Sequence, residues 1–266
     1  MMKASRNKLL SDPRYVEFCI RYRHNLYRYV IEVGEIQPTW QQAQLLKAIE
    51  KPGARAACSS GHGTGKSKVY ATAIDWHLRV YPFSNTLLTA NNISQCRSVV
   101  WKELDSVMNA TDRAFPFMAG HFIKETKRYY TKGYKDTWFA IPKTAAKYKP
   151  ESIAGMHNKN YLILVDEASA LEDEILEVLR GGLTEERNRF AMISQYTRAS
   201  GHFHEAFNSL SDIYETMQFN SEESPLVSKN YIRECLITYG GHHSPEYQIR
   251  VLGRRADNLS GYLIPL

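Results

Sequence analysis

The chain has 266 residues, of which 43% are hydrophobic and 23% are charged, and its formal net charge is +6. These values are typical of a globular protein with a real core, and they exclude a disordered or fibrous chain. The longest apolar run, residues 161–165, is too short to cross a bilayer, and the four cysteines form no C-x-x-C pair, so we expect a soluble, intracellular protein. The modest positive charge fits either a polyanionic partner or an ordinary solvated surface.

The N-terminal part of the chain shows the periodicity of a helix. Apolar residues at spacings of three and four predict an amphipathic helix over residues 14–33, and residues 1–35 are expected to form an N-terminal helical extension. Its arginines lie off the apolar stripe, which indicates arginines in water or, alternatively, a helix that contacts DNA. Pro38 then leads into a second amphipathic helix over residues 40–49, which Pro52 and Gly53 end.

Strands and helices alternate beyond residue 53. The expected strands are 55–59, 85–90, 137–141, 161–165, 189–194 and 214–219, and the expected helices are 67–79, 94–108 and 175–179. This alternation predicts an α/β fold with a mainly parallel central sheet flanked by helices, formed by residues 36–250. Residues 251–266 show too little periodicity for a new domain and are interpreted as a tail or linker.

The strongest motif is a glycine-rich loop between an expected strand and an expected helix. The pattern G-x4-G-K-[ST] is met at Gly65, Lys66 and Ser67 and departs from consensus at Ser60. Backbone N–H groups of such a loop bind phosphates, the lysine adds a positive charge for phosphate binding and catalysis, and the serine hydroxyl coordinates Mg²⁺. The residues expected to surround the phosphates are Ser60, Gly61, His62, Gly63, Thr64, Gly65, Lys66 and Ser67. The sequence therefore predicts a P-loop NTPase.

An acidic pair follows the most apolar expected strand. Asp166 and Glu167 come directly after residues 161–165, where ligands bind at the carboxyl ends of strands in open α/β sheets. Asp166 is expected to hold Mg²⁺ through water, and Glu167 to accept a proton from the attacking water or to orient it. The alternative is a pair of acids that only stabilises the start of the next helix.

The segment around the acidic pair and three further stretches, in the same order, resemble the motifs of the large terminase subunits of tailed phages. They are 38–41 (PTWQ), 87–91 with Gln95 (LLTAN), 153–171 around the acidic pair, and 191–198 (AMISQYTR) with Gly201 and Phe203. The resemblance covers roughly residues 36–260. It implies a RecA-like ATPase domain of the ASCE class that hydrolyses ATP with Mg²⁺.

The resemblance also implies roles for single residues and for partners. Gln41 would read the adenine edge, and Ser194 and Gln195 would sense the γ-phosphate. Alternatively, Gln41 is a solvated helix residue and Ser194–Gln195 a polar strand end. The implied partners are double-stranded DNA, a small terminase subunit, a portal protein and further copies of the chain in a ring. The implied location is the cytoplasm of the infected bacterium, docked on the procapsid portal.

Two departures from that family pattern matter. Many terminases carry an arginine within the phosphate loop where this sequence has His62, and neutral histidine stabilises developing charge less well than a fixed cation. Arg198, Arg187 and Arg189 are candidates for the missing catalytic arginine, each also explicable as a surface charge. In addition, the C-terminal nuclease domain usual in the family does not follow, which predicts a motor without a nuclease.

A basic segment over residues 121–150 is the candidate DNA contact. It holds eight basic and two acidic residues, interleaved with aromatic ones, and its strongest candidates are Lys127, Arg128, Lys132 and Lys135. Such residues give salt-sensitive, sequence-independent DNA binding. A turn at residues 132–134 between two possible strands predicts a hairpin, and the alternative is a sheet edge protected by lysines.

Three functions remain open from sequence: a DNA-translocating ATPase, a helicase-like or remodelling ATPase of another P-loop family, and a nucleotide-binding switch. A helicase usually needs a second RecA-like lobe, for which the chain is too short. No substrate-lid motif of a small-molecule kinase and no N-K-x-D element for GTP are present. The sequence therefore favours the translocating ATPase.

Overall fold

One mixed sheet forms the centre of the protein in a computed structural model that describes residues 8–33, 36–144 and 156–256. The strand order is β3-β4-β5-β2-β6-β7-β1-β8. The strands are β1 Arg55–Ser60, β2 Asn85–Thr89, β3 Phe122–Glu125, β4 Arg128–Thr131, β5 Phe139–Pro142, β6 Tyr161–Asp166, β7 Arg189–Ser194 and β8 Glu215–Phe219. Pairing is parallel from β5 to β8 along this order and antiparallel between β3, β4 and β5. The predicted mainly parallel sheet is confirmed.

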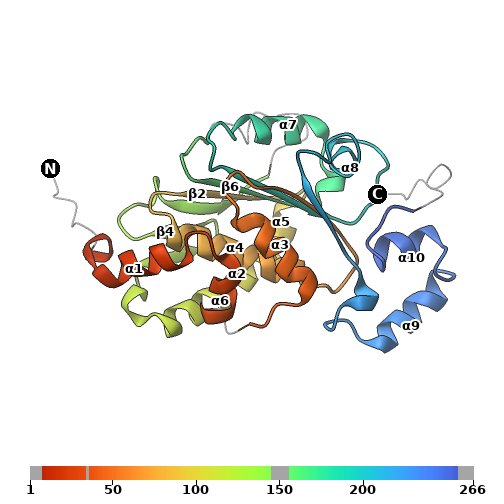
Figure 1. The fold of residues 1–266 in the computed structure, drawn as a ribbon, viewed down its shortest axis with the longest axis horizontal. Coiled ribbons are helices and arrows are strands. Elements are labelled where there is room, and N and C mark those ends of the chain that lie inside the picture. The colour runs from red at the N-terminus through yellow and green to blue at the C-terminus, as the bar shows by residue number, and fades with distance from the viewer. Residues whose placement is uncertain (1–7, 34–35, 145–155, 257–266) are drawn as a thin grey trace.

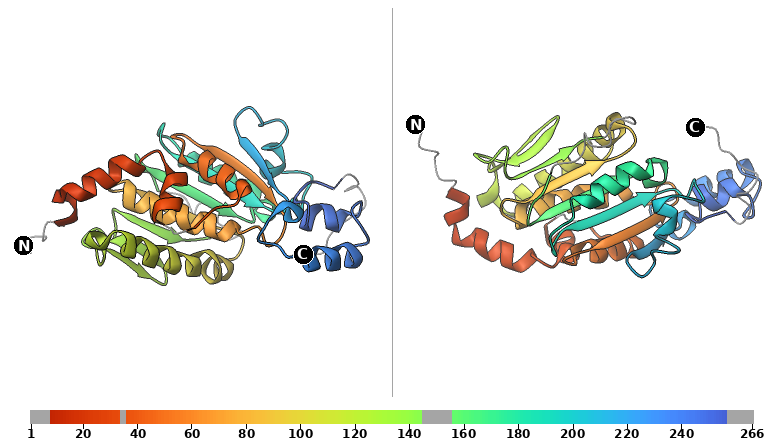
Figure 2. Two further views of the ribbon diagram at one scale, coloured as in Figure 1. Left: turned by 60° about the horizontal axis from the view of Figure 1, so that its bottom comes forward. Right: turned by 90° about the horizontal axis from the view of Figure 1, so that it is seen from above.

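Helices cover both faces of this sheet (Figures 1 and 2). They are α1 Pro13–Tyr22, α2 Leu26–Val33, α3 Trp40–Glu50, α4 Lys66–Val80, α5 Ile93–Ser98, α6 Val100–Ala114, α7 Asp173–Gly181, α8 His202–Glu205, α9 Lys229–Thr238 and α10 Pro245–Arg250. In Figure 1, α1 to α4 and α6 lie below the sheet, α7 and α8 above it, and α9 and α10 at one end. In the described part of the chain no helix is long and apolar enough to span a membrane.

Strand β6 has an unbroken run of apolar residues because its side chains are buried on both faces of the sheet. Its side chains alternate between two cores, because successive residues of a strand point to opposite faces. Leu162 and Leu164 pack with the core that holds α1 to α4 and α6, whereas Ile163 and Val165 pack with the core that holds α7 and α8. Burial on both faces fixes the register of β6 and therefore the place where Asp166 emerges.

The pairing register aligns the carboxyl ends of three neighbouring strands, β1, β7 and β6. Strand β7 lies between β1 and β6, and its Ile193 pairs with Cys58 on one side and with Asp166 on the other. The residues that follow these strands therefore meet at one edge of the sheet. A strand inserted between the phosphate-loop strand and the acidic strand is the arrangement of the ASCE class, so that prediction is confirmed.

The expected single helix over residues 14–33 is in fact two helices, and this prediction was wrong. The chain turns between α1 and α2, and two carbonyl groups at this turn accept side-chain hydrogen bonds from α4 and from the residue just after it. Trp76 donates to the carbonyl of Tyr22 at 2.8 Å, and Tyr81 donates to the carbonyl of Arg23. The apolar stripe runs through the break because both helices pack on the same core, so periodicity alone does not reveal it.

Other element boundaries also differ from expectation. The helix expected over residues 94–108 is divided at Val99 into α5 and α6, and α6 runs on to Ala114. The predicted turn at residues 132–134 does connect two antiparallel strands, β4 and β5, with Gly133 at φ +88°. Helices α9 and α10, with short and weak apolar periodicity, were not predicted.

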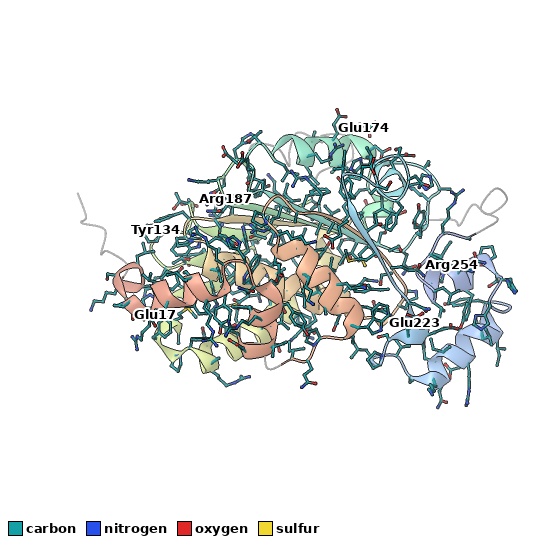
Figure 3. All side chains as sticks on the ribbon, in the orientation of Figure 1. Glu17, Tyr134, Glu174, Arg187, Glu223 and Arg254 are labelled. Atoms are coloured by element: carbon teal, nitrogen blue, oxygen red, sulfur yellow. The ribbon has the colours of Figure 1, made fainter. Side chains whose placement is uncertain are left out.

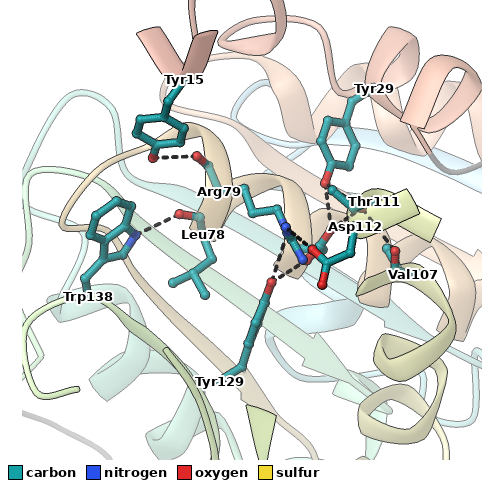
Figure 4. A network of polar contacts seen from close by, with 10 residues as sticks. Tyr15, Tyr29, Leu78, Arg79, Val107, Thr111, Asp112, Tyr129 and Trp138 are labelled. Atoms are coloured by element: carbon teal, nitrogen blue, oxygen red, sulfur yellow. Dashed lines mark hydrogen bonds and ion pairs between the residues drawn. The ribbon is translucent and has the colours of Figure 1, made fainter. Parts of the chain in front are cut away.

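A buried polar network joins the phosphate-loop helix to four neighbouring elements (Figure 4). Arg79 and Asp75 of α4 form an ion pair at 2.8 Å, and both side chains are 0% exposed. The Asp75 carboxylate also accepts hydrogen bonds from Tyr29 of α2, Thr111 of α6 and Tyr129 of β4. Tyr15 of α1 donates to the carbonyl of Arg79 at 2.8 Å. The network therefore fixes α4 against these elements.

Candidate nucleotide-binding site

The phosphate loop follows β1 and opens α4, as predicted. Gly65 is the N-cap of α4 with φ +78°, and no side chain caps the helix. The N–H groups of Lys66 and Ser67 are thus available to an anion, whereas the N–H of Lys68 donates to the carbonyl of Gly65 at 3.2 Å. Within the loop, Lys66 Nζ lies 3.4 Å from the carbonyl oxygen of Gly61, and the buried Ser60 and Thr64 hydroxyls share a hydrogen bond of 2.8 Å. Ser60 and Thr64 therefore shape the loop from inside.

Gln42 supports the loop from α3, and sequence reasoning missed it. Its Oε1 accepts the N–H of Thr39 and completes a capping box, while its Nε2 donates to the carbonyl groups of Thr64 at 3.3 Å and Gly65 at 3.2 Å. A Cβ on Gly65 would lie 2.3 Å from that nitrogen. The Thr39-x-x-Gln42 pattern is a detectable capping signal, but it carries no information about the loop contact.

The last residue of α10 and the residues after it contact the loop from the other side. The carbonyl of Arg250 accepts the N–H of His62 at 2.8 Å, and Ser221, whose N–H donates to the carbonyl of Val251, donates its hydroxyl to the His62 carbonyl at 2.7 Å. Gly253 has φ +63°, and a Cβ there would lie 2.6 Å from the nitrogen of Gly61. The first residues of the expected tail or linker thus pack on the phosphate loop, whereas residues 257–266 lie outside the described part of the chain.

The acidic pair emerges from β6 beside this loop. Asp166 Oδ1 accepts the N–H of Glu167 at 3.0 Å, and Glu167 has the left-handed backbone conformation with φ +53°. Burial raises the pKa of Asp166, with the charge of Glu167 adding to that rise and Lys66 opposing it. Asp166 therefore lies within electrostatic reach of both Lys66 and Glu167, as the two motifs together predicted.

Residues at the end of β7 contact both motifs. Ser194 Oγ accepts the N–H of Ser169, just after the acidic pair, at 3.1 Å. Gln195 Nε2 lies 3.3 Å from His62 Nε2 in the phosphate loop. Burial, together with the charges of Lys66 and Arg250, lowers the pKa of His62, so the ring is neutral at pH 7. His62 thus serves as a polar neighbour of Gln195 in place of a fixed cation.

Gln41 is fully buried at the start of α3. Its Nε2 donates to the carbonyl of Asn220, which follows β8, at 2.9 Å, but its Oε1 has no hydrogen-bond partner. An unpaired buried acceptor is costly, so this oxygen suits a donor that a ligand brings, such as the amino group of adenine. The alternative of a solvated helix residue is therefore wrong for Gln41.

The residues at this edge of the sheet fit a nucleotide with Mg²⁺. The loop offers an uncapped helix N-terminus and a lysine for phosphates, and Gln41 offers an unpaired oxygen. Ser67 and Asp166 supply oxygen donors, and Mg²⁺ in such sites is held by one or two protein oxygens together with water and phosphate. Ser67 and Asp166 are therefore the residues that would hold the ion.

The structure separates the arginine candidates. The side chain of Arg189 is buried at the start of β7, where it donates to the carbonyl groups of Glu50 and Arg187 and to the hydroxyl of Tyr81. Arg187 lies on that same side, away from Glu223 and Arg254 at the other end of the molecule (Figure 3). Arg198 alone of the three is near the site, where its N–H donates to Ser169 Oγ at 3.1 Å.

The raised pKa of Asp166 has a consequence for stability. A carboxylate whose pKa is raised by folding destabilises the folded state once the pH exceeds its unfolded pKa. We expect Asp166→Asn to stabilise the metal-free protein at pH 7 by about 1 kcal/mol, or roughly 2–4 °C in Tm. The gain should shrink toward pH 4, near the ordinary aspartate value of 3.8.

Thermal unfolding at pH 7 and at pH 4, with a chelator present, measures the stabilisation by Asp166→Asn. The control is Asp212→Asn, because Asp212 is exposed. An unchanged or lower Tm of Asp166→Asn at pH 7 contradicts the argument.

The candidate DNA residues lie in and beside β4, toward the β3 end of the strand order, whereas the phosphate loop follows β1 near the β8 end. Lys127 and Lys132 are exposed in the turns that flank β4. Arg128 pairs with Asp136 at 2.6 Å, and Lys135 pairs with Glu125 at 2.8 Å, so part of the positive charge is neutralised. The interleaved residues Tyr129 and Trp138 are buried in the core and cannot stack on bases, and Lys147 and Lys149 lie outside the described residues.

The fold and the site define this chain as a P-loop NTPase of the RecA-like ASCE class. No family model matches the chain. It is 30% identical over 262 residues, or 96% of its length, to a probable large terminase subunit of Enterobacteria phage P7. The resemblance to large terminase subunits that the motifs predicted is therefore confirmed.

Solved structures agree on the fold. The large terminase ATPase domain of Thermus phage P74-26 matches with a TM-score of 0.64 and 14% identity, over 86% of this chain and 98% of that domain. A large terminase from another thermophilic bacteriophage, in complex with ADP, matches with a TM-score of 0.62 and 14% identity, over 82% of this chain and 54% of that protein. The HK97 large terminase matches with a TM-score of 0.58 and 11% identity, over 87% of this chain and 55% of that protein.

The chain spans about half the length of its curated relative, 53%. The comparisons therefore cover an ATPase domain and not the whole of that relative. At identities under 15%, the solved structures show the shared fold, and roles of single residues rest on the geometry described above.

Proposed function

We propose that the chain is the ATP-hydrolysing motor domain of a genome-packaging machine that moves double-stranded DNA. The observation that carries this proposal is the convergence of Lys66, Asp166 and Glu167 at the carboxyl ends of β1 and β6, with Gln195 beside them after β7. Paired acids next to a phosphate loop are the parts that phosphoryl transfer to water requires. The similarity to a large terminase subunit supports DNA as the moved polymer.

Each residue has a role that follows from its place. The α4 N-terminus and Lys66 bind the phosphates, and Gln41 Oε1 accepts from the adenine amino group. Glu167 accepts the proton of a water molecule as that water attacks the γ-phosphorus and the bond to the β–γ bridging oxygen breaks, which gives ADP and phosphate. Ser67 and Asp166 would hold Mg²⁺, which neutralises charge on the phosphates when bound.

Phosphoryl transfer also needs a cation that stabilises the negative charge of the transition state. Arg198 is the candidate within this chain, because its backbone is bound to Ser169 beside the acidic pair. A ring of subunits, with an arginine supplied by a neighbour, is the alternative arrangement. The further partners that we propose by similarity are the small terminase subunit and the portal protein, in the cytoplasm of an infected bacterium.

Coupling to DNA is tested with paired charge reversals. We expect double-stranded DNA to raise the rate of ATP hydrolysis, and Lys127→Glu/Lys132→Glu to weaken DNA binding and to reduce the slope of log K against log salt by about 2. The control is Lys229→Glu/Arg233→Glu on α9, because it changes the net charge equally on exposed residues.

Equal losses in the two double variants would mean that the turns flanking β4 are not the DNA surface. Hydrolysis that DNA never stimulates would favour a nucleotide-binding switch over a motor.

A further inference from the structure

Ser169 connects the segment after the acidic pair to the loop after β7. Its side chain is buried in the 3-10 helix η4 (Ala168–Ala170). Its backbone N–H donates to Ser194 Oγ at 3.1 Å, and its own hydroxyl accepts the N–H of Arg198 at 3.1 Å. That hydroxyl also shares a hydrogen bond of 3.0 Å with Thr197 Oγ1. One residue therefore makes three bonds to the end of β7 and the loop that follows it.

Glu167 lies two residues before Ser169 in a backbone conformation that needs support. Its φ of +53° is the left-handed region, which a residue other than glycine adopts only when its surroundings hold it there. The N–H of Ala170 donates to the carbonyl of Glu167 at 2.9 Å, so η4 closes directly onto this residue. Because Ser169 anchors η4, it also anchors the backbone that aims the Glu167 carboxylate.

The same loop reaches the phosphate loop at its other end. Gln195 follows Ser194, and its Nε2 lies 3.3 Å from His62 Nε2. A continuous path therefore runs from His62 through Gln195 and Ser194 to Ser169.

We propose that Ser169 is a positioning residue that holds the Glu167 carboxylate in its catalytic orientation, through contacts that extend to the phosphate loop. This inference rests on the proposed function, because it matters only where Glu167 activates water. Ser169 acts through the backbone of the segment that carries Glu167. Its effect is on the rate of the chemical step and not on nucleotide affinity.

The first measurement compares Ser169→Ala with Ser200→Ala, a nearby exposed serine. We expect Ser169→Ala to lower kcat by about tenfold to a hundredfold, because small misplacements of a catalytic group are costly, and to leave the Kd for a non-hydrolysable ATP analogue within about twofold. Ser200→Ala should match the wild type in both. A rise in Kd that accounts for the loss, with kcat intact, overturns the proposal.

A double-mutant cycle with Glu167→Gln separates positioning from general structure. If Ser169 acts through Glu167, then Ser169→Ala causes no further loss of hydrolysis once the carboxylate is gone. An equal loss in both backgrounds overturns the proposal. Should Ser169→Ala fold poorly, Thr197→Val removes one bond at an exposed position, and we expect a loss of about threefold with the same dependence on Glu167.

The results for Glu167→Gln and Ser169→Ala distinguish a failure of the proposed function from a failure of the role of Ser169. Glu167→Gln that hydrolyses ATP like the wild type contradicts the proposed function itself. Glu167→Gln that is inactive, with Ser169→Ala indistinguishable from Ser200→Ala, contradicts only the role of Ser169.

Discussion

Glu167→Gln should lower the rate of ATP hydrolysis by roughly 10²–10⁴-fold while ATP still binds. The substitution removes the proton-accepting carboxylate but keeps the size and hydrogen-bonding shape of the side chain. The phosphate loop, Lys66 and Gln41 remain in place, so affinity for nucleotide should change little. Single-turnover hydrolysis together with binding of a fluorescent ATP analogue measures the two effects separately.

The matched control is Glu174→Gln on the exposed first turn of α7 (Figure 3). It makes the same chemical change a short distance along the chain and should leave hydrolysis at the wild-type rate. Equal rates for Glu167→Gln and the wild type would mean that another group activates the water.

Asp75→Ala should have the largest effect on folding. It leaves the Arg79 guanidinium buried without its main counter-ion and removes the acceptor of three hydroxyl groups. Burial, together with the charge of Asp75, raises the pKa of Tyr29, so this phenol is protonated and donates to the carboxylate at neutral pH. Breaking a buried ion pair costs about 3–5 kcal/mol, which corresponds to a fall in Tm of roughly 10 °C.

Asp112→Asn is the control for this change. Asp112 also binds Arg79, at 2.8 Å, but its side chain is 29% exposed, so water can replace it and a loss of only about 1 kcal/mol is expected. Calorimetric or circular-dichroism melting of the three proteins compares the effects. Equal falls in Tm for the two variants would mean that burial of the Arg79–Asp75 pair does not decide the stability of this region.

Local signals predicted the centre of the fold and the core of the site. β6 and β7 were found because runs of buried apolar residues are long and end in polar ones, and the phosphate loop because its chemistry demands glycine, lysine and serine at fixed spacing. The carboxyl ends of parallel strands meet at one edge, so Lys66 and Asp166 were expected on the same side of the sheet, but their strands are not neighbours because β7 lies between β1 and β6.

Contacts between distant segments could not be predicted in the same way. The approach of Gly253 to Gly61 and the bond from Ser221 to His62 join residues more than 150 positions apart, and no periodicity records them. At the break between α1 and α2, Trp76 of α4 and Tyr81 just after it donate hydrogen bonds to carbonyl groups of the turn. Such features are decided by tertiary hydrogen bonds, which local patterns do not encode.

The most direct test of the central claim is Mg²⁺-dependent ATP hydrolysis by this chain, with and without double-stranded DNA, in the wild type and in Lys66→Ala. The arrangement of the phosphate loop beside Asp166 and Glu167 predicts turnover by the wild type that DNA increases and that Lys66→Ala abolishes. A wild-type protein that binds ATP but never hydrolyses it, even with DNA and at high protein concentration, or a Lys66→Ala variant that turns over ATP like the wild type, would contradict it.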